Sequence, residues 1–246
     1  MILPKPEDAI HKLQLLRLLG EIVDDSVLSQ SFFFKGGTCA AMLGYLDRFS
    51  LDLDFDLSHE ADKKICRKRL VTIFAKLHLE IKQKSKQELF YVLKYKSKGS
   101  LRNTLKLGIV GQQARTNIYQ PFYLAEMDRF AICQTIETMF SHKLVAPIDR
   151  FKKYKTIAGR DMYDIHHFFL KGYRYMEAII EERTGKKPGS FFIELKNFIE
   201  KQVSEKVISE DLNYLLPAES FQLIRNILKK EIIVFLNDEI RRLQIK

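Results

Sequence analysis

The sequence contains no apolar run of the roughly 18–20 residues that a helix needs to cross a bilayer. Its first residues, MILPKPEDAIHKLQ, lack the apolar stretch of a secretion signal. It has only three cysteines, Cys39, Cys66 and Cys133, with no C-x-x-C spacing, which argues against a zinc site. These absences argue against a membrane protein, and scattered cysteines suit the reducing cytoplasm, where we expect the protein to reside.

Acidic residues are too few to balance the basic ones, and the net charge is +10. A surplus of this size favours polyanionic partners such as RNA, DNA or nucleotides, although a generally basic proteome would also explain it. Tyr91, Tyr95 and Tyr154 lie among the basic residues and would suit stacking on bases, but aromatic residues in strands are more often core. The basic residues cluster at Lys82, Lys84 and Lys86, at Lys94, Lys96, Lys98 and Arg102, and at Arg150, Lys152, Lys153 and Lys155.

The most informative segment is FFFKGGTCAAMLGYLDRFSLDLDFDL, residues 32–57. Three phenylalanines bounded by glycine predict a buried strand. Gly36 and Gly37 allow backbone N–H groups to approach a ligand closely. Thr38 occupies the expected N-cap of a short helix, whose N-terminus attracts anions. The segment therefore predicts a strand, a turn able to hold phosphates, and a helix.

A second strand in this segment carries alternating aspartates. Side chains alternate along a strand, so Asp52, Asp54 and Asp56 are expected on one face. Aspartate is depleted in strands, and carboxylates this close repel one another unless a cation lies between them. Magnesium is commonly held by one or two carboxylates and substrate phosphates. We therefore predict Mg²⁺ (or Mn²⁺) at Asp52 and Asp54, the alternative being an ordinary half-exposed strand.

The order of the expected elements predicts an α/β (α+β) fold, with a mixed sheet and flanking helices followed by a C-terminal helical bundle. We place the boundary so that the first domain covers residues 1–125 and the second 126–246. The first half is expected to hold helices at 7–20, 38–46 and 60–78, strands at 32–35, 51–57, 79–83, 89–96 and 105–110, and a hairpin loop at 96–100. After Pro121 the periodicity predicts helices at 127–144, 160–181, 189–203 and 219–243.

A second polar cluster lies in the expected helical half. Lys143 and Arg150 are seven residues apart and share one helix face, unless Pro147 kinks or ends the helix. Asp161 and Asp164 are three apart and are neighbours on a helix. The functional interpretation is that Lys143 offsets phosphate charge, while the two aspartates orient a base or hold Lys143 or Arg150 in position. The alternative is a set of surface or interdomain salt bridges.

Two blocks of the sequence resemble one known family. KGGT at 35–38 followed by RFSLDLDF at 48–55, and HKLVAPIDRFKKYKTIAGRDMYDIHHF at 142–168, are similar to the AbiEii/AbiGii-type toxins of the nucleotidyltransferase superfamily. The blocks occur in family order and together cover about 55 residues. The resemblance implies a nucleotidyltransferase fold and an active site assembled from both blocks, where domains meet.

With the resemblance, each residue receives an expected role. We expect catalytic roles for Asp52, Asp54, Lys143 and Asp161, and metal binding by Asp52 and Asp54. We expect nucleotide contacts from Lys35, Gly36, Gly37, Thr38, Arg48, Ser50 and Lys143. Arg48 and Ser50 could equally anchor their loop.

The sequence departs from the usual pattern in one position. Many nucleotidyltransferases carry a third carboxylate on a later strand, and here that place falls near Gly108. Its usual role is to deprotonate the acceptor hydroxyl, so the base is unassigned. Asp56, Glu80, Glu88 or the Asp161/Asp164 pair could substitute.

The resulting hypothesis is a metal-dependent enzyme that transfers NMP from an NTP to an acceptor. The basic surface favours RNA as that acceptor, with the end of tRNA as one possibility. The resemblance implies the toxin of a bacterial toxin–antitoxin or phage-defence system with a separate antitoxin. Two alternatives are transfer to a protein or small molecule, and a non-catalytic nucleic-acid-binding protein on the same fold.

Overall fold

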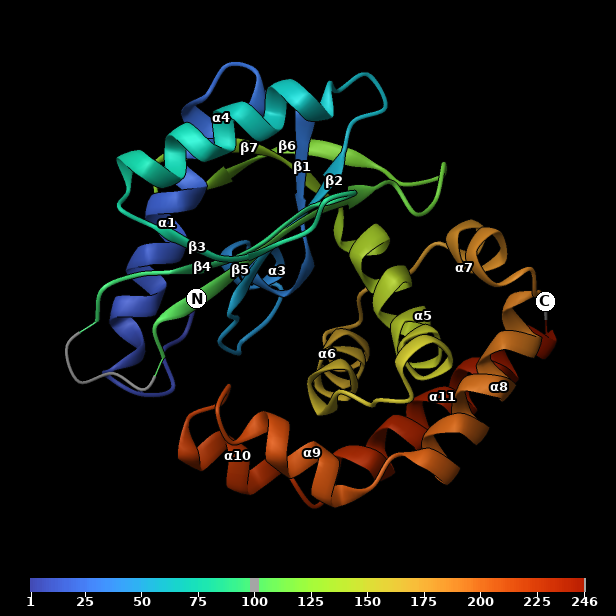
Figure 1. Cartoon of the computed structure of the whole chain (residues 1–246). Coiled ribbons are helices and arrows are strands. Elements are labelled where there is room, and N and C mark those ends of the chain that lie inside the picture. Colours follow the sequence, from blue (N-terminus) through green and yellow to red (C-terminus); the bar gives the residue numbers. More distant parts are fainter. Residues whose placement is uncertain (98–101, 246) are drawn as a thin grey trace. The chain divides into compact units, whose positions relative to one another are not determined.

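The computed structural model describes residues 1–97 and 102–245 and divides the chain into two compact units. The first consists of Met1–Gln113 and Ile118–Thr135, and the second of Ala114–Asn117 and Ile136–Lys246. Figure 1 traces the chain through both. Part of the expected hairpin loop at 96–100 lies outside the described residues, as does Lys98.

The first unit is built on one mixed sheet with the strand order β3-β4-β5-β2-β1-β7-β6. The central strand β2 pairs antiparallel with β1 and parallel with β5. This topology places the aspartate strand in the interior of the sheet, with β3 and β6 at the edges. The strands are β1 (Phe32–Lys35), β2 (Asp52–Leu57), β3 (Glu80–Lys84), β4 (Leu89–Lys94), β5 (Thr104–Gly111), β6 (Tyr119–Leu124) and β7 (Arg129–Gln134).

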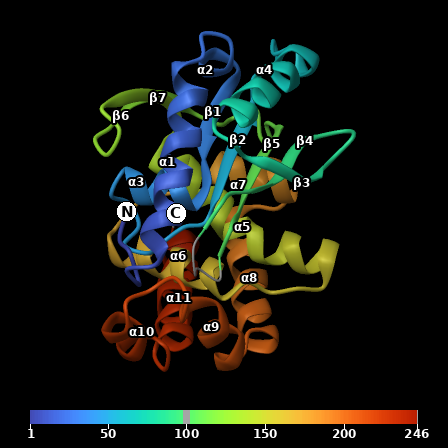
Figure 2. The same ribbon diagram turned by 60° about the vertical axis from the view of Figure 1, so that its left-hand side comes forward.

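Two helices cover one face of this sheet. Helix α1 (Asp8–Asp24) and helix α4 (Lys63–Lys76) contact each other and the sheet, as Figures 1 and 2 show. Phe74 of α4 packs edge-on against Tyr91 of β4, with ring centroids 5.0 Å apart. The other helices of this unit are short: α2 (Leu28–Ser31) and α3 (Gly36–Met42).

Strand alternation gives the sheet two chemically different faces. Phe34, Leu53 and Leu107 are fully buried and belong to the face under α1 and α4, which we call the core face. The opposite side chains of β2 are Asp52, Asp54 and Asp56, and we call their side the aspartate face. The sequence-based assignment of the aspartates to one face of a strand is thus consistent with the register.

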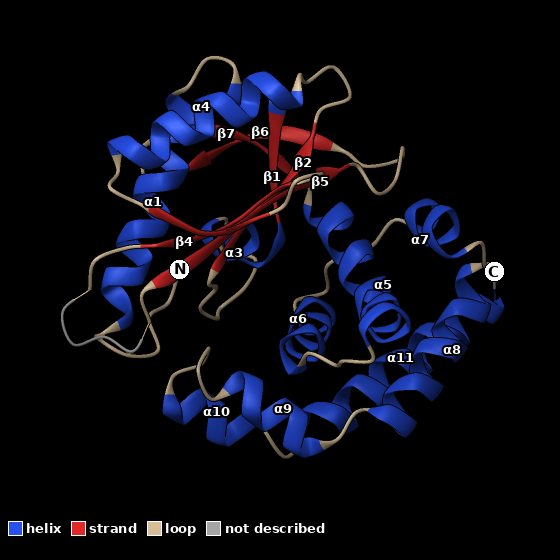
Figure 3. Cartoon of the chain, viewed as in Figure 1, coloured by secondary structure: helices blue, strands red, loops and turns tan. Residues whose placement is uncertain are grey.

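Within the described residues, the second unit contains helices and no strands, as the colouring of Figure 3 shows. Helix α5 is the longest at 19 residues and continues through Pro147, which therefore does not end it. The helices are α5 (Ile136–Tyr154), α6 (Gly159–Leu170), α7 (Glu177–Thr184), α8 (Pro188–Gln202), α9 (Glu205–Leu212), α10 (Ala218–Ile224) and α11 (Leu228–Ile245).

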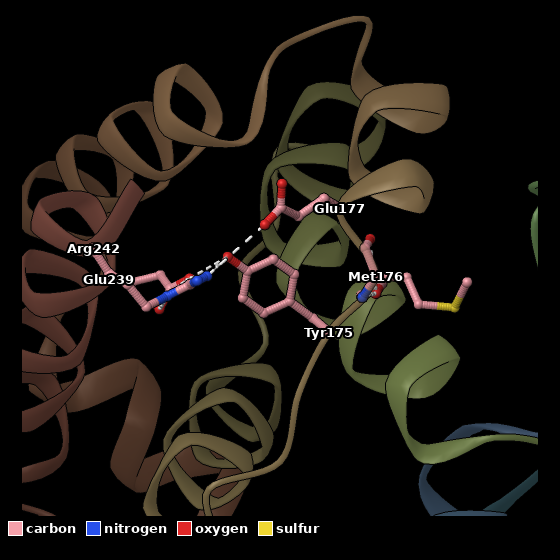
Figure 4. A network of polar contacts seen from close by, with 6 residues as sticks. Tyr175, Met176, Glu177, Glu239 and Arg242 are labelled. Carbon is pink, nitrogen blue, oxygen red and sulfur yellow. Dashed lines mark hydrogen bonds and ion pairs between the residues drawn. The ribbon is translucent and has the colours of Figure 1, made fainter. Parts of the chain in front are cut away.

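A polar network ties the loop between α6 and α7 to α11 (Figure 4). The Tyr175 hydroxyl donates to the Glu239 carboxylate, and Arg242 donates to the same carboxylate and, at 3.1 Å, to the tyrosine oxygen. Burial and the adjacent Glu239 raise the pKa of Tyr175. The neutral hydroxyl therefore remains a donor at neutral pH and fixes the loop.

Several sequence-based expectations for the elements were wrong. Residues 129–134 form strand β7, not part of a helix over 127–144, and strand β6 was not expected. Because β7 joins the sheet, the first unit extends to Thr135, beyond the expected boundary at 125. The expected helix 160–181 is two helices, α6 and α7, and α9 was missed.

Among the described residues, no helix is both long enough and apolar enough to cross a bilayer. All three cysteines are buried free thiols.

Candidate active site

Asp52 and Asp54 lie on β2 between strands β1 and β5. Asp54 pairs with Lys35 of β1 on one side and with Gly108 of β5 on the other. Asp52 pairs with Lys106 of β5. Both aspartates are partly exposed. The expected acid position near Gly108 is therefore directly beside Asp54, and a glycine occupies it.

Two glycines leave room for the Asp54 carboxylate. A Cβ atom added to Gly36 would lie 2.8 Å from Oδ2 of Asp54, and one added to Gly108 would lie 3.3 Å from Oδ1. Gly36 also has a φ of +79°, which other residues rarely adopt. Any side chain at position 36 would be strained and would displace the carboxylate.

Helix α3 begins at the Gly-Gly turn, two residues earlier than expected. The helix starts at Gly36, with Lys35 as N-cap, so Thr38 is in the first turn and is not the cap. The buried Thr38 hydroxyl donates to the backbone oxygen of Asp52, and its oxygen lies 2.9 Å from Ser50 Oγ. These two contacts of Thr38 tie the turn to the aspartate strand. The first-turn N–H groups of a helix have no intrahelical partner and can meet an anion.

Arg48 and Ser50 lie behind this turn. Arg48 is 2% exposed and donates from Nη1 to the backbone oxygen of Phe49 at 2.9 Å. A Cβ added to Gly37 would lie 2.8 Å from Arg48 Nη2 and 2.9 Å from Ser50 Oγ. This burial supports anchoring of the loop more than contact with a ligand.

Asp56 has a different role from the two aspartates before it. It is fully buried, and its Oδ1 accepts from Lys35 Nζ at 2.5 Å. Its Oδ2 accepts from the Tyr119 hydroxyl at 2.8 Å and from Gln134 Nε2 at 2.7 Å. We call these four residues the Asp56 network. With three donors in place, Asp56 is poorly suited to replace the missing acid. Tyr119 and Gln134 were not identified from the sequence, because they lie on strands β6 and β7.

The other first-unit acids considered as substitutes lie at the surface. Glu88 is exposed and pairs with exposed Lys63 at 3.2 Å. Glu80 is exposed on edge strand β3. Neither is among the strand partners of β2.

A buried histidine supports the start of the aspartate strand. Nε2 of His11 is 2.9 Å from the backbone oxygen of Leu51, and Nδ1 is 2.9 Å from the Tyr95 hydroxyl. Burial lowers the pKa of His11 to about 4, although the Leu51 carbonyl opposes that shift. The imidazole is therefore neutral at pH 7.

In the second unit, the expected polar cluster forms two ion pairs. Lys143 Nζ lies 2.7 Å from Asp164 Oδ2, and Arg150 Nε lies 3.0 Å from Asp161 Oδ2. Both carboxylates are almost completely buried, at 0% and 2% side-chain exposure. The prediction that these aspartates hold Lys143 or Arg150 in position agrees with this geometry. The participation of Lys143 and Asp161 in catalysis stays a prediction.

The neighbouring histidines make protein contacts. His142 accepts at Nδ1 from Arg183 at 2.8 Å, and its Nε2 lies 2.7 Å from Asn117 Oδ1. His166 lies 2.6 Å from Glu231. These contacts suit structural roles, and Arg183 was not identified from the sequence.

The aspartate pair fits a hard divalent cation. Asp52 and Asp54 supply two carboxylates on one face, and within the described residues Asp52 forms no ion pair. No group of three or more His, Cys, Asp or Glu side chains in the described part of the chain is arranged to hold a metal. Magnesium commonly takes one or two carboxylates and completes its shell with phosphates and water, which matches this donor set.

The structure also sorts the aromatic and basic residues. Tyr91 and Tyr95 are buried at 0% and 3% exposure, so the suggestion that they stack on bases was wrong; their alternative role as core residues is confirmed. Tyr154 is 60% exposed. Lys82 and Lys84 are exposed on β3.

The sequence model of the family described as "Nucleotidyl transferase AbiEii toxin, Type IV TA system" matches residues 17–226. No curated protein shows significant similarity to the chain.

Three solved structures share the fold. One from H. pylori, assigned as a nucleotidyltransferase, is 22% identical with a TM-score of 0.59, covering 95% of this chain and 98% of its own. JHP933 from Helicobacter pylori is 22% identical with a TM-score of 0.53, covering 98% of each chain. MenT4, a nucleotidyltransferase toxin from Mycobacterium tuberculosis, is 15% identical with a TM-score of 0.57, covering 96% of this chain and 87% of its own. The expected nucleotidyltransferase fold is therefore confirmed, and with the family match over most of its length, the chain belongs to the AbiEii family of nucleotidyltransferase toxins.

Proposed function

We propose that this protein transfers a nucleotidyl group from an NTP to an RNA acceptor in a reaction that depends on Mg²⁺ or Mn²⁺. The observation that carries the proposal is the position of Asp52 and Asp54 on one face of β2, beside the Gly36–Gly37 turn. Family membership implies a nucleotide substrate and an antitoxin partner. The cytoplasm is the proposed location.

The turn provides the anion-binding part of the site. The N–H groups at the start of α3 would meet the triphosphate, with the helix N-terminus adding positive potential. Gly36 and Gly37 allow this close approach because they carry no side chain. Thr38 holds the turn against β2 through the hydrogen bond from its hydroxyl to the backbone oxygen of Asp52, and it also contacts Ser50 Oγ at 2.9 Å.

The aspartates provide the cation-binding part. Asp52 and Asp54 would hold the divalent ion, which when bound offsets charge on the reacting phosphate oxygens. An acceptor hydroxyl attacks the α-phosphorus and pyrophosphate leaves. Because such reactions depend mainly on positioning and charge stabilisation, both carboxylates must remain ionised.

Basic side chains complete the proposal. Lys35 lies opposite Asp54 on β1, and its ammonium is fixed by Asp56. Lys143, fixed by Asp164, is proposed to supply further positive charge, with Asp161 acting through Arg150. RNA is favoured as acceptor by the net charge of +10 and by exposed lysines such as Lys82 and Lys84.

The test is incubation with each α-labelled NTP, Mg²⁺ and total bacterial RNA. We expect label on RNA. We expect Asp52→Asn/Asp54→Asn to reduce transfer by at least about a thousandfold, because the variant would no longer hold the cation that offsets charge at the reacting phosphate. Glu88→Gln is the matched control, since Glu88 is an exposed carboxylate away from β2. Circular dichroism checks that both variants fold.

Each other outcome has a distinct meaning. Label on a protein or small molecule, and none on RNA, would identify that molecule as the acceptor. No label on any acceptor would favour a non-catalytic protein. Full transfer by the folded double variant would contradict the assignment of the two aspartates.

A further inference from the structure

We propose that the aspartate face of strands β4 and β5 binds the acceptor as a single-stranded polynucleotide, adjacent to Asp52 and Asp54. This inference rests on the proposed function and locates one substrate within it. The surface consists of Phe90, Val92, Lys94, Lys106 and Gly108, and we call it the β4–β5 surface.

The register of the sheet brings these residues together. Gly108 pairs with Asp54 on one side and with Phe90 on the other. Lys106 pairs with Asp52 on one side and with Val92 on the other. Because paired residues in adjacent strands project to the same face, the β4–β5 surface is continuous with the aspartate pair.

Gly108 leaves an open position between a charge and an aromatic ring. A Cβ atom at this position would lie 3.3 Å from Asp54 Oδ1 and 4.0 Å from Phe90 Cδ2. Any larger side chain would fill the space between them. The glycine therefore allows a planar group resting on Phe90 to reach the carboxylate without obstruction.

The composition of the surface suits a nucleic acid strand. Helices α1 and α4 cover the core face of the sheet, whereas Phe90 and Val92 lie on the opposite face and are partly exposed. Lys94 and Lys106 are exposed, and within the described residues neither forms an ion pair. An aromatic platform flanked by unpaired lysines is the arrangement that binds single strands, through base stacking and phosphate contacts.

The geometry favours a polynucleotide over a second nucleotide. Lys106 pairs with Val92, and Lys94 lies two residues further along β4, so the two lysines are diagonal neighbours about 7–8 Å apart at Cα. Such spacing suits separate phosphates of one strand. The Gly36–Gly37 turn, assigned to the triphosphate, lies on the β1 side of β2, whereas this surface lies on the β5 side. The two substrates would thus approach the aspartates from opposite sides.

The experiment measures binding separately from turnover. A fluorescent single-stranded RNA oligonucleotide is titrated with the full chain at several salt concentrations. We expect Phe90→Ala to weaken binding about tenfold through lost stacking. We expect Lys94→Ala/Lys106→Ala to reduce the log–log salt slope by about 1.4, which is about 0.7 for each phosphate contact on a single strand.

Controls come from exposed residues elsewhere on the first unit. Phe130→Ala removes a phenylalanine that is 67% exposed on β7, and Lys68→Ala removes an exposed lysine of α4, on the other side of the sheet. Both should leave affinity and salt slope unchanged. Phe90→Leu keeps the apolar volume but removes the ring. It should fold and bind RNA weakly, and it therefore tests stacking if Phe90→Ala fails to fold.

The outcomes separate this inference from the proposed function. Asp52→Asn/Asp54→Asn should lose transfer but still bind RNA. If the unaltered chain transfers no label to any acceptor yet binds RNA in a Phe90-dependent way, the proposed function is refuted and the surface stands. Unchanged RNA affinity in the Phe90 and lysine variants would overturn the surface, as would absent RNA binding at low salt. A raised KM for NTP with unchanged RNA affinity would reassign the surface to the nucleotide.

Discussion

The Asp56 network makes a quantitative prediction about stability. Asp56→Ala removes an acceptor that serves Lys35, Tyr119 and Gln134 in a fully buried position. Removing one partner of a buried ion pair costs about 3–5 kcal/mol. The Lys35 side chain is 16% exposed and can recover part of its hydration. We therefore expect a loss near the lower end, about 3 kcal/mol, from the free energy of unfolding.

Asp56→Asn should also lower the free energy of unfolding, because its amide keeps one acceptor oxygen and turns a donor NH2 group toward donors from Tyr119 and Gln134. The amide oxygen can still accept from Lys35, but the charge is gone, and charge-assisted hydrogen bonds are about twice as strong as neutral ones. In the double variant Lys35→Met/Asp56→Ala the ammonium is no longer left without its partner. Its loss should therefore be smaller than the sum of the two single losses.

The assay is urea denaturation followed by circular dichroism, with unfolding free energies taken from the midpoint and slope. Glu88→Ala is the control, because the Lys63–Glu88 pair is also a lysine–carboxylate pair, but both side chains are about half exposed. Exposed pairs contribute about 0–1 kcal/mol. A loss for Asp56→Ala no larger than that of the control, or strict additivity in the double variant, would refute the network as described.

Two further predictions concern Lys143 and His11. Lys143→Met should lower stability because it leaves the buried Asp164 carboxylate without that partner, and it should lower turnover because a proposed phosphate contact is lost. Adding Asp164→Asn should restore part of the stability but not the turnover. Restored turnover in the double variant would exclude a contact between Lys143 and the nucleotide. His11 has a folded pKa of about 4 against an ordinary value of 6.5, so the unfolded chain binds its proton first on acidification. The stability that His11 contributes is complete above pH 6.5 and is lost as pH falls to 4, a change of up to about 3 kcal/mol. Unfolding measurements across this range should show a steeper decline for the native chain than for His11→Asn, and parallel curves would contradict the assignment.

The sequence was most informative where local pattern alone decides structure. Strand β1 was predicted with its observed bounds because three phenylalanines meet a glycine turn. Strand β6 was missed because Pro121 is unusual in strands, yet it is tolerated at an edge. Strand β7 contains the apolar run Phe130–Cys133, which periodicity cannot distinguish from part of a helix.

The candidate site shows the same division. Asp52, Asp54 and the glycine turn were found from alternation and composition. The Asp56 network was not found, because it depends on the register between β1 and β2 and on residues from the unrecognised strands β6 and β7. Pairing partners that are distant in sequence leave no local pattern, so Tyr119 and Gln134 could not be identified without the structure.

The two edges of the sheet have a consequence for the behaviour of the protein in a crowded solution. An open edge strand exposes backbone groups that can recruit a strand from another molecule. Here β6 carries Pro121, which has no N–H to offer, and β3 carries Lys82 and Lys84 with an irregularity between Ile81 and Gln83. Proline, like charges and a distorted edge each oppose the growth of an intermolecular sheet. We therefore expect the sheet to resist edge-to-edge aggregation even when the protein is concentrated.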